Sequence, residues 1–117
     1  MRGEQYLVKK EQYQSVYQKG GNWSNRYLVV RVLPNNLEFS RFGITVSRKV
    51  GKAVVRNRIK RLIREIIRKT PVEPGYDIVF IARIAAAGAG YALVKKSTEE
   101  LLARAGLSLG EHEEISS

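Results

Sequence analysis

The 117-residue chain is long enough for one domain with a modest hydrophobic core, and 44% hydrophobic content is typical of a globular protein. It has no cysteine, which excludes disulfides, thiolate metal sites and cysteine nucleophiles. Its formal net charge of +10 favours a polyanionic partner, nucleic acid ahead of an anionic membrane surface. Because no segment resembles a signal peptide or a membrane helix, we expect a cytoplasmic protein.

The first half of the chain predicts one helix and two strands. Residues 11–19 predict a short helix, which the glycines at 20–21 end. Its apolar face carries Tyr13, Val16 and Tyr17. The β-branched segment 26–33 predicts a strand, and the turn residues 34–36 lead into a hairpin partner at residues 39–47. Alternation in this second strand places Phe42, Ile44 and Val46 on one side, and Arg41, Gly43, Thr45 and Ser47 on the other.

The second half predicts a long helix, a buried strand and a last helix. The long helix covers residues 53–69 and ends at Thr70-Pro71. The apolar run at residues 76–82 (YDIVFIA) predicts the third strand. Residues 92–105 predict the last helix, which Gly106 ends. Its expected core contacts are Leu93, Leu101 and Leu102.

These elements indicate an α+β protein without internal repeats. We expect residues 1–110 to form a single compact domain with the order α-β-β-α-β-α. In it, a small mixed β-sheet packs with an N-terminal helix, a long basic helix and a C-terminal helix. Residues 111–117 form an acidic tail that we expect to be disordered.

The positive charge is concentrated in one quarter of the chain. Residues 41–69 contain eleven basic residues and one acid, Glu65, whereas the rest of the chain contains ten of each sign. The basic residues are Arg41, Arg48, Lys49, Lys52, Arg56, Arg58, Lys60, Arg61, Arg64, Arg68 and Lys69. Such a concentration of positive charge produces an electrostatic field that attracts polyanions to one region, which indicates a nucleic-acid-binding surface.

The long helix separates these charges from its apolar residues. At 100° per residue, one stripe contains Val55, Ile59, Leu62, Ile63 and Ile66. A second row, four residues apart, contains Arg56, Lys60, Arg64 and Arg68, with Asn57 and Arg61 beside it. A solvated face usually mixes signs, because like charges at this spacing destabilise a helix. The row therefore favours a phosphate-binding face, and Asn57 could contact a sugar hydroxyl or a base edge.

Three separated motifs resemble the protein component of bacterial ribonuclease P (RNase P). Residues 51–65 (GKAVVRNRIKRLIRE) resemble its Arg-Asn-Arg signature, and residues 47–51 (SRKVG) resemble the turn that precedes it. Residues 9–20 are similar to the family's N-terminal helix, with tyrosines where two phenylalanines are usual. Asn25-Arg26 and residues 77–83 (DIVFIAR) also fit, so the resemblance covers about residues 7–104.

The resemblance implies two RNA-binding surfaces and a left-handed connection through the long helix, where general rules favour a right-handed one. The contacts to the catalytic RNA would be Lys52, Arg56, Asn57, Arg58, Lys60, Arg61, Arg64 and Arg68. The contacts to the single-stranded 5′ leader of precursor tRNA would be Tyr13, Tyr17, Arg31, Ser47, Arg48 and Lys49. Tyr13 and Tyr17 could equally be core residues, since their spacing permits both. Arg31 stands where the family often has an aromatic residue, and Ile84 offers no basic contact.

The implied function is that of the RNase P protein subunit, which assists the removal of the 5′ leader from precursor tRNA. The partners would be the RNase P catalytic RNA and precursor tRNA, with a monomeric protein present in one or two copies per RNA. We expect no cofactor or metal on the protein and no catalytic side chains, because the basic segment has one acid and the only histidine is His112. The endoribonuclease chemistry would belong to the RNA and its Mg²⁺. The principal alternative is a structural or ribosomal RNA-binding protein, and a DNA-binding helix is a further one.

Overall fold

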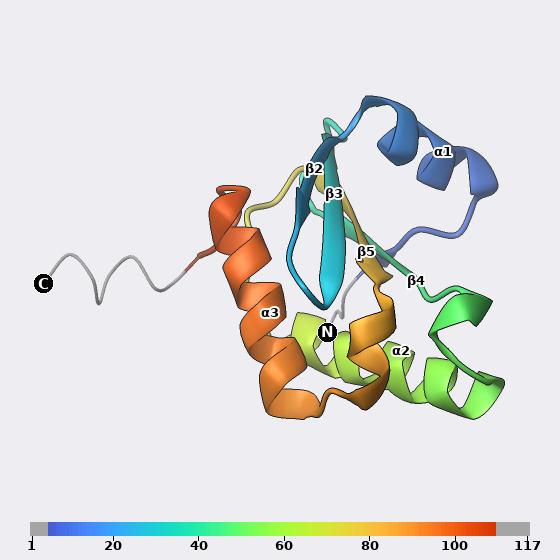
Figure 1. Cartoon of the computed structure of the whole chain (residues 1–117). Helices are drawn as coiled ribbons and strands as arrows, with labels where there is room; N and C mark the ends of the chain where they lie inside the picture. Colours follow the sequence, from blue (N-terminus) through green and yellow to red (C-terminus); the bar gives the residue numbers. More distant parts are fainter. Residues whose placement is uncertain (1–4, 110–117) are drawn as a thin grey trace, which may run out of the picture.

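A five-stranded mixed sheet with helices on both faces forms the centre of the protein (Figure 1). The structure is a computed structural model that describes residues 5–109. The strands are β1 (Gln5–Tyr6), β2 (Gly21–Ser24), β3 (Leu28–Pro34), β4 (Arg41–Thr45) and β5 (Tyr76–Ala82). The helices are α1 (Lys10–Lys19), α2 (Ala53–Lys69) and α3 (Tyr91–Arg104), with 3-10 turns η1 (Arg48–Val50) and η2 (Ile84–Gly88). The α+β class is therefore confirmed, while the tail at residues 111–117 lies outside the described residues.

The sheet has the order β1-β4-β5-β3-β2, with β5 at its centre. β5 pairs parallel to β4 and antiparallel to β3. Four successive residues of β5, from Asp77 to Phe80, are buried, because the strand is covered on both faces. An apolar run without alternation is typical of such a central strand.

The predicted hairpin between β3 and β4 is wrong, since β5 lies between these strands. The two strands follow each other in the chain, but β5 offers apolar side chains to both faces of the sheet and needs a neighbour on each edge. The turn after β3 instead contacts the start of β5: the Asn35 amide donates to the Gly75 carbonyl at 2.9 Å. The prediction that β3 pairs with β4, the next strand in the chain, was therefore wrong, and β3 pairs with β5 instead.

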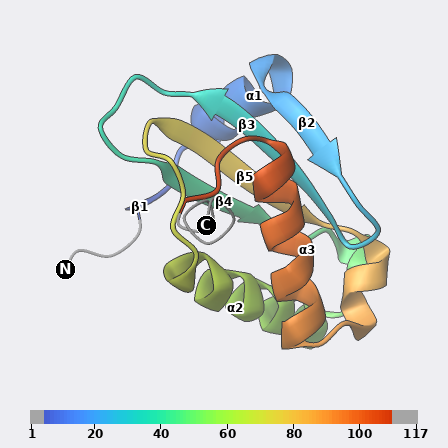
Figure 2. The same ribbon diagram turned by 90° about the vertical axis from the view of Figure 1, so that its left-hand side faces the viewer.

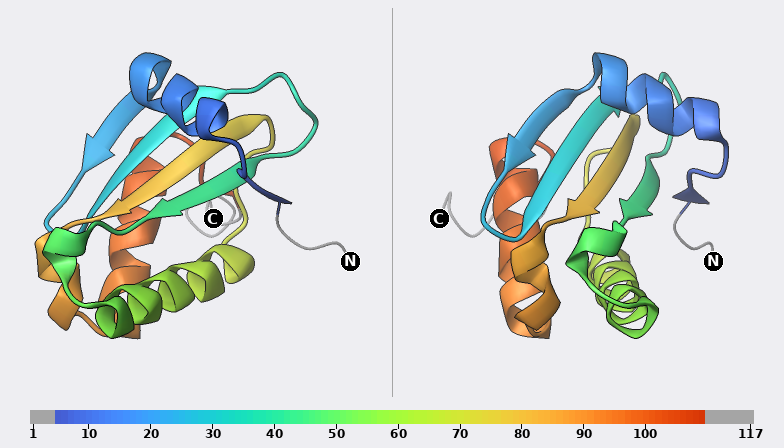
Figure 3. Two further views of the ribbon diagram at one scale, coloured as in Figure 1. Left: turned by 90° about the vertical axis from the view of Figure 1, so that its right-hand side faces the viewer. Right: turned by 45° about the vertical axis from the view of Figure 1, so that its right-hand side comes forward.

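The two faces of the sheet are covered by different helices (Figures 2 and 3). The α2 and α3 helices cover the face where the large core lies, which contains Leu28, Val30, Ile78 and Phe80 from the strands. The α1 helix covers the opposite face, where Val16 packs with Val79 and Leu7 in a small second cluster. The alternation predicted for β4 is confirmed, because Phe42 is in the large core while Gly43 lies against Tyr13 of α1.

Several predicted boundaries shift for identifiable reasons. The α3 helix begins and ends one residue earlier than the predicted range 92–105. The bounds of α2 agree with the predicted range 53–69. β3 begins at Leu28 rather than residue 26, because the Asn25 side chain accepts from the amides of Tyr27 and Leu28 and holds a turn there. β2 was not predicted, since Gly21 and its polar neighbours have low strand propensity and depend on pairing with β3. The two-residue β1 was missed as well.

The prediction that Leu93 is a core residue is wrong, since it is 43% exposed. The buried face of α3 carries Val94, Ser97, Thr98, Leu101 and Leu102, and Leu93 lies beside this face. Within residues 5–109, no helix is both long enough and apolar enough to span a membrane.

Candidate nucleic-acid interface

The α2 helix has one face in the core and the other in solvent. The predicted apolar stripe is confirmed, because its members are buried in the large core or packed against it: Val55, Ile59, Leu62, Ile63 and Ile66. Ile67, which the periodicity left out, is buried too. This packing fixes the rotation of α2, so the remaining positions must face away from the protein.

Cations on the outer face of α2 form a surface without internal partners. Lys52, at the N-cap, and the helix residues Arg56, Asn57, Lys60, Arg61 and Arg64 are exposed or half-exposed. We call these six residues the helix surface. Within residues 5–109, their side chains make no hydrogen bond or ion pair, so their charges and donors are available to a ligand. The spacing of four residues in Arg56, Lys60 and Arg64 sets these cations one turn apart along the helix.

Two of the predicted contacts to the catalytic RNA are engaged within the protein. The Arg58 guanidinium donates to the carbonyls of Ala87, at 2.6 Å, and Ala89, at 3.4 Å, and so attaches the η2 region to α2. Arg68 forms an ion pair with Glu65, and the Glu65 carboxylate is also 2.9 Å from Lys69 Nζ. The hydrogen bond from Lys69 and the charge of Arg68 lower the pKa of the Glu65 carboxyl. The C-terminal end of α2 therefore presents less free charge than its sequence indicates.

The N-terminal end of α2 has no side-chain cap and no acid in its first turn. Helices usually have a polar cap or an acidic residue there, because the first amides lack partners and the helix dipole is positive at this end. Directly before it, Ser47 precedes η1, and Arg48 and Lys49 lie within η1. All three residues are exposed. This end of the helix thus has the unpaired donors and positive charges of an anion-binding site.

On the opposite face of the sheet, Tyr13 and Tyr17 of α1 lie against β4. A Cβ atom at Gly43 would lie 2.6 Å from the Tyr13 ring, so the ring contacts the strand backbone directly. The Tyr17 hydroxyl shares a hydrogen bond of 3.2 Å with Thr45 Oγ1. We call Tyr13, Tyr17, Gly43 and Thr45 the tyrosine surface. Gly43 and Thr45 were not among the predicted contacts, although strand alternation placed them on this side.

Neither tyrosine is sealed in the core. The fully buried residue of α1 is Val16, whereas Tyr17 is 37% exposed and Tyr13 is half-buried. The two rings are 6.4 Å apart between centroids and inclined by 50°. Burial raises the pKa of the Tyr13 phenol, and the neighbouring Tyr17 raises it further. The partial exposure makes an aromatic contact to a ligand possible at Tyr17 in particular.

Arg31 of β3 supports Tyr17 from the side of the sheet. Its guanidinium donates to the Tyr17 carbonyl at 2.5 Å, and it lies 6.0 Å from the centre of the Tyr17 ring. Its Nε atom is buried without a hydrogen-bond partner among the described residues. Arg31 therefore positions the end of α1, and this structural role occupies the side chain that was predicted to contact the leader.

β4 and η1 connect the two surfaces. Thr45 is the last residue of β4, and Ser47 follows two residues later, so their Cα atoms are at most about 7 Å apart.

The start of β4 is held by Arg41, which forms a bidentate ion pair with the buried Asp77 at 2.8 and 2.7 Å. Asn35 donates to the same carboxylate at 2.9 Å. The hydrogen bonds that the Arg41 guanidinium donates to the Asp77 carboxylate are the main cause of the raised pKa of Arg41.

Among the described residues, no three histidine, cysteine or acidic side chains gather in a group that could hold a metal ion. A small α+β fold with segregated cations and a half-exposed aromatic pair is typical of nucleic-acid-binding domains. Comparison with known proteins gives the family. The family model described as Ribonuclease P matches residues 1–106.

Curated relatives and solved structures agree with this match. The chain is 47% identical over 107 residues to a ribonuclease P protein component of Clostridium kluyveri, which covers 87% of this chain and 96% of that one. The protein of Clostridioides difficile is 43% identical over 106 residues, with 88% and 93% covered. The RNase P protein of Staphylococcus aureus superposes with a TM-score of 0.78 at 37% identity, covering 86% of this chain and 94% of that one. The RNase P protein of Thermotoga maritima superposes with a TM-score of 0.77 at 33% identity, covering 86% of this chain and 97% of that one. The chain belongs to the ribonuclease P protein component family.

Proposed function

We propose that this protein is the subunit of RNase P that binds the catalytic RNA through the helix surface and the 5′ leader of precursor tRNA through the tyrosine surface. The observation that carries this proposal is the set of unpaired cations on α2, because charges without internal partners on a rigid helix are available for phosphates. Membership of the family supports the choice of RNase P over other RNA-protein complexes.

On the helix surface, Arg56, Arg61 and Arg64 would each present a planar fork that suits two phosphate oxygens. Lys52 and the uncapped amides of α2 would bind a further phosphate at the start of the helix. Asn57 could donate to a ribose hydroxyl and accept from it, which would distinguish RNA from DNA. The buried isoleucine stripe holds these groups in a fixed row, so binding requires little ordering of the protein.

On the tyrosine surface, the exposed part of Tyr17 would stack on an unpaired base of the leader. Base stacking on an aromatic side chain contributes about 1–3 kcal/mol with little dependence on sequence. Arg48 and Lys49 follow β4 directly and would neutralise the phosphates of the same strand. Arg31 and Thr45 would act as positioning residues, because they fix the carbonyl and the hydroxyl of Tyr17.

The hydrolysis itself would be carried out by the RNA and its Mg²⁺, and the protein residues would bind and orient the substrate. This assignment makes the protein a component of an endoribonuclease without catalytic side chains of its own. We further propose a monomeric protein in the cytoplasm, assembled with its RNA in one or two copies.

Reconstitution tests this function. The protein, mixed with an RNase P RNA and precursor tRNA at low Mg²⁺ concentration, should restore cleavage at the mature 5′ end. Variant Arg61→Gln should require more protein for the same cleavage rate, whereas Arg104→Gln, which removes an exposed cation from α3, should behave as the parent protein. Binding of the RNA without any gain in cleavage would favour the structural or ribosomal alternative.

Binding of the leader has a separate test. Tyr17→Ala should weaken the binding of precursor tRNA by enzyme saturated with the variant, but hardly change the binding of mature tRNA, which has no leader. Tyr17→Phe is the matched control, because it keeps the ring and loses only the hydrogen bond to Thr45. An equal loss for both tRNA ligands would show that Tyr17 has a packing role and that the leader binds elsewhere.

A further inference from the structure

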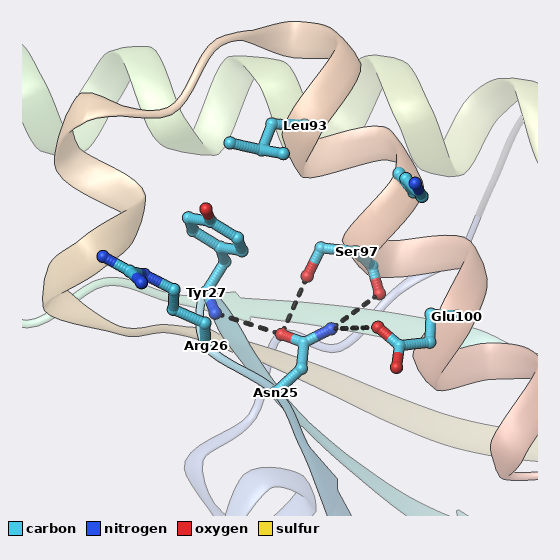
Figure 4. A pocket seen from close by; sticks show the side chains of 7 residues that line it. Asn25, Arg26, Tyr27, Leu93, Ser97 and Glu100 are labelled. Carbon is cyan, nitrogen blue, oxygen red and sulfur yellow. Dashed lines mark hydrogen bonds between the residues drawn. The ribbon is translucent and has the colours of Figure 1, made fainter.

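A pocket of about 250 Å³ lies between the start of β3 and the outer side of α3, away from both surfaces described above (Figure 4). Its lining residues are Asn25, Arg26, Tyr27, Leu93, Lys96, Ser97 and Glu100. The volume is below the range of sites for drug-sized ligands and suits one small flat group. Neither the helix surface nor the tyrosine surface includes any of these residues.

The Asn25 side chain gives the pocket a rigid floor. Its Oδ1 atom accepts from the Tyr27 and Leu28 amides, and from Ser97 Oγ at 2.8 Å. Its Nδ2 atom donates to the Ser97 carbonyl at 3.2 Å and to Glu100 Oε1 at 3.0 Å. Asn25 therefore connects β3 to α3 with all its hydrogen-bonding groups engaged, and the pocket does not have to be formed when a ligand arrives.

The walls of the pocket are apolar and aromatic. Figure 4 shows the Tyr27 ring and the Leu93 side chain facing each other across the pocket. Leu93 is 43% exposed there, although it lies next to the buried face of α3. The Arg26 guanidinium lies 5.9 Å from the centre of the Tyr27 ring. An aromatic ring, an opposing aliphatic group and an adjacent arginine are the elements of a stacking site for a base with its phosphate.

A second groove leads from this pocket to η1. It is lined by Arg26, Ser47, Lys49, Val50, Ala82, Arg83, Ile84 and Ala85. Arg26 is shared with the pocket at Tyr27, and Ser47 and Lys49 are shared with the proposed leader contacts. Its lining includes three cations and no acid, and the cations come from three separate segments of the chain. Arg83 is fixed there, because its guanidinium donates to the Asn25 carbonyl at 2.9 Å.

We infer that the pocket at Tyr27 binds a nucleotide of single-stranded RNA, namely a distal nucleotide of a long 5′ leader. The strand would pass from Lys49 through the cationic groove and place a base between Tyr27 and Leu93, with a phosphate at Arg26. This inference rests on the proposed function, and it extends the path of the leader around the protein toward α3. The leader is favoured over the catalytic RNA because the groove is continuous with its proposed contacts.

The one acid of the pocket does not oppose this assignment. Glu100 accepts from Asn25 and has Arg104 NH1 at 3.9 Å, so its charge is partly compensated. In Figure 4 Glu100 lies at the opposite end of the pocket from Arg26. Its free oxygen could accept a hydrogen bond from an exocyclic amino group of a base.

A series of precursor tRNAs with stepwise longer leaders tests the inference, with enzyme reconstituted at saturating protein. Tyr27→Leu keeps an apolar side chain on the core and removes the ring. It should weaken binding of the longest leader by about fivefold or more, the factor expected for one lost base stack. For the same substrate, Arg26→Gln should make the slope of log K against log salt shallower by about 0.7, because one phosphate contact is lost. Both variants should bind substrates with the shortest leaders as the parent does.

Tyr91→Leu is the matched control on α3, since it removes a half-buried ring that packs against the same core as Tyr27 but lies outside the pocket and the groove. A loss that is equal at every leader length would overturn the inference and place the contact on the catalytic RNA or the tRNA body. Unchanged binding at every length by both variants would overturn it as well. If the parent enzyme itself binds precursor and mature tRNA equally, the proposed function fails instead, so the two failures are distinguishable.

Discussion

Ile63 and Arg64 are adjacent in α2, but Ile63 faces the core and Arg64 faces solvent, so substituting each should separate stability from RNA binding. The Ile63 side chain is completely buried in the large core. Ile63→Ala removes the equivalent of about three methylene groups, each contributing about 0.8 kcal/mol. With the cavity that remains, the free energy of unfolding should fall by about 2–4 kcal/mol. The melting temperature should then decrease by roughly 10 °C or more.

Arg64 is exposed and makes no hydrogen bond or ion pair within residues 5–109. Arg64→Gln should therefore change the free energy of unfolding by less than about 0.5 kcal/mol. Its effect should appear in RNA binding, because one cation of the helix surface is lost. The affinity for the catalytic RNA should fall, and the slope of log K against log salt should become shallower by about 0.8.

Thermal unfolding of the free protein and a salt series of RNA-binding measurements check both expectations. Ile63→Ala should bind RNA with the parent salt slope at a temperature where it is folded. The reasoning is refuted if both variants lose stability equally, or if Ile63→Ala alone changes the salt slope. Either result would mean that the rotation of α2 in solution differs from the one described.

Four further substitutions probe contacts outside this pair. Glu65→Gln should release two cations at the end of α2, so RNA affinity at low salt should increase with little change in melting temperature; a decrease would contradict this. Asp77→Asn should leave the half-buried Arg41 without its counter-charge and lower the free energy of unfolding by about 3 kcal/mol, measured by urea denaturation. Gly43→Ala should force the Tyr13 ring away from β4, lowering stability by about 1–3 kcal/mol and reducing the preference for precursor over mature tRNA. The Tyr13 phenol should titrate above its usual pKa of about 10, and Tyr13→Phe should remove that step from the ultraviolet titration. Because the pKa is raised in the folded protein, the associated stability is present below the unfolded pKa and is lost as the pH rises through the folded value.

The helices were predictable because their periodicity is local. The bounds of α2 follow from an apolar stripe and from Thr70-Pro71, and both signals lie within the helix or next to it. The sheet order was not predictable in this way, because the position of β5 between β3 and β4 depends on contacts between segments far apart in the chain. The short strand β2 shows the same limit, since its pairing partner rather than its composition makes it a strand.

The sequence predicted which cations belong to the candidate site. It did not predict which of them form contacts within the protein and which are available to a ligand. Of the eleven cations in residues 41–69, four are engaged within the protein: Arg41, Arg58, Arg68 and Lys69. The other seven make no side-chain hydrogen bond or ion pair within residues 5–109 and are available to a ligand. The partners of Arg41 and Arg58 are Asp77 and the carbonyls of Ala87 and Ala89, which follow about thirty residues later in the chain. Counting the basic residues of a segment does not reveal contacts with distant parts of the chain, and it therefore overestimates the charge that is available to a ligand.

The internal contacts of the engaged arginines also determine how the two proposed surfaces lie relative to each other. Arg58 attaches η2 to α2, and η2 in turn packs against η1, which joins β4 to α2. Val50 of η1 is buried in the large core, so this connection is part of the core rather than a free loop. A strand bound along Tyr17 and Lys49 would thus be held in a fixed position relative to an RNA bound on α2. Arg58 therefore has a structural reason to be arginine whether or not it contacts RNA, because its two carbonyl partners require a guanidinium with several donors.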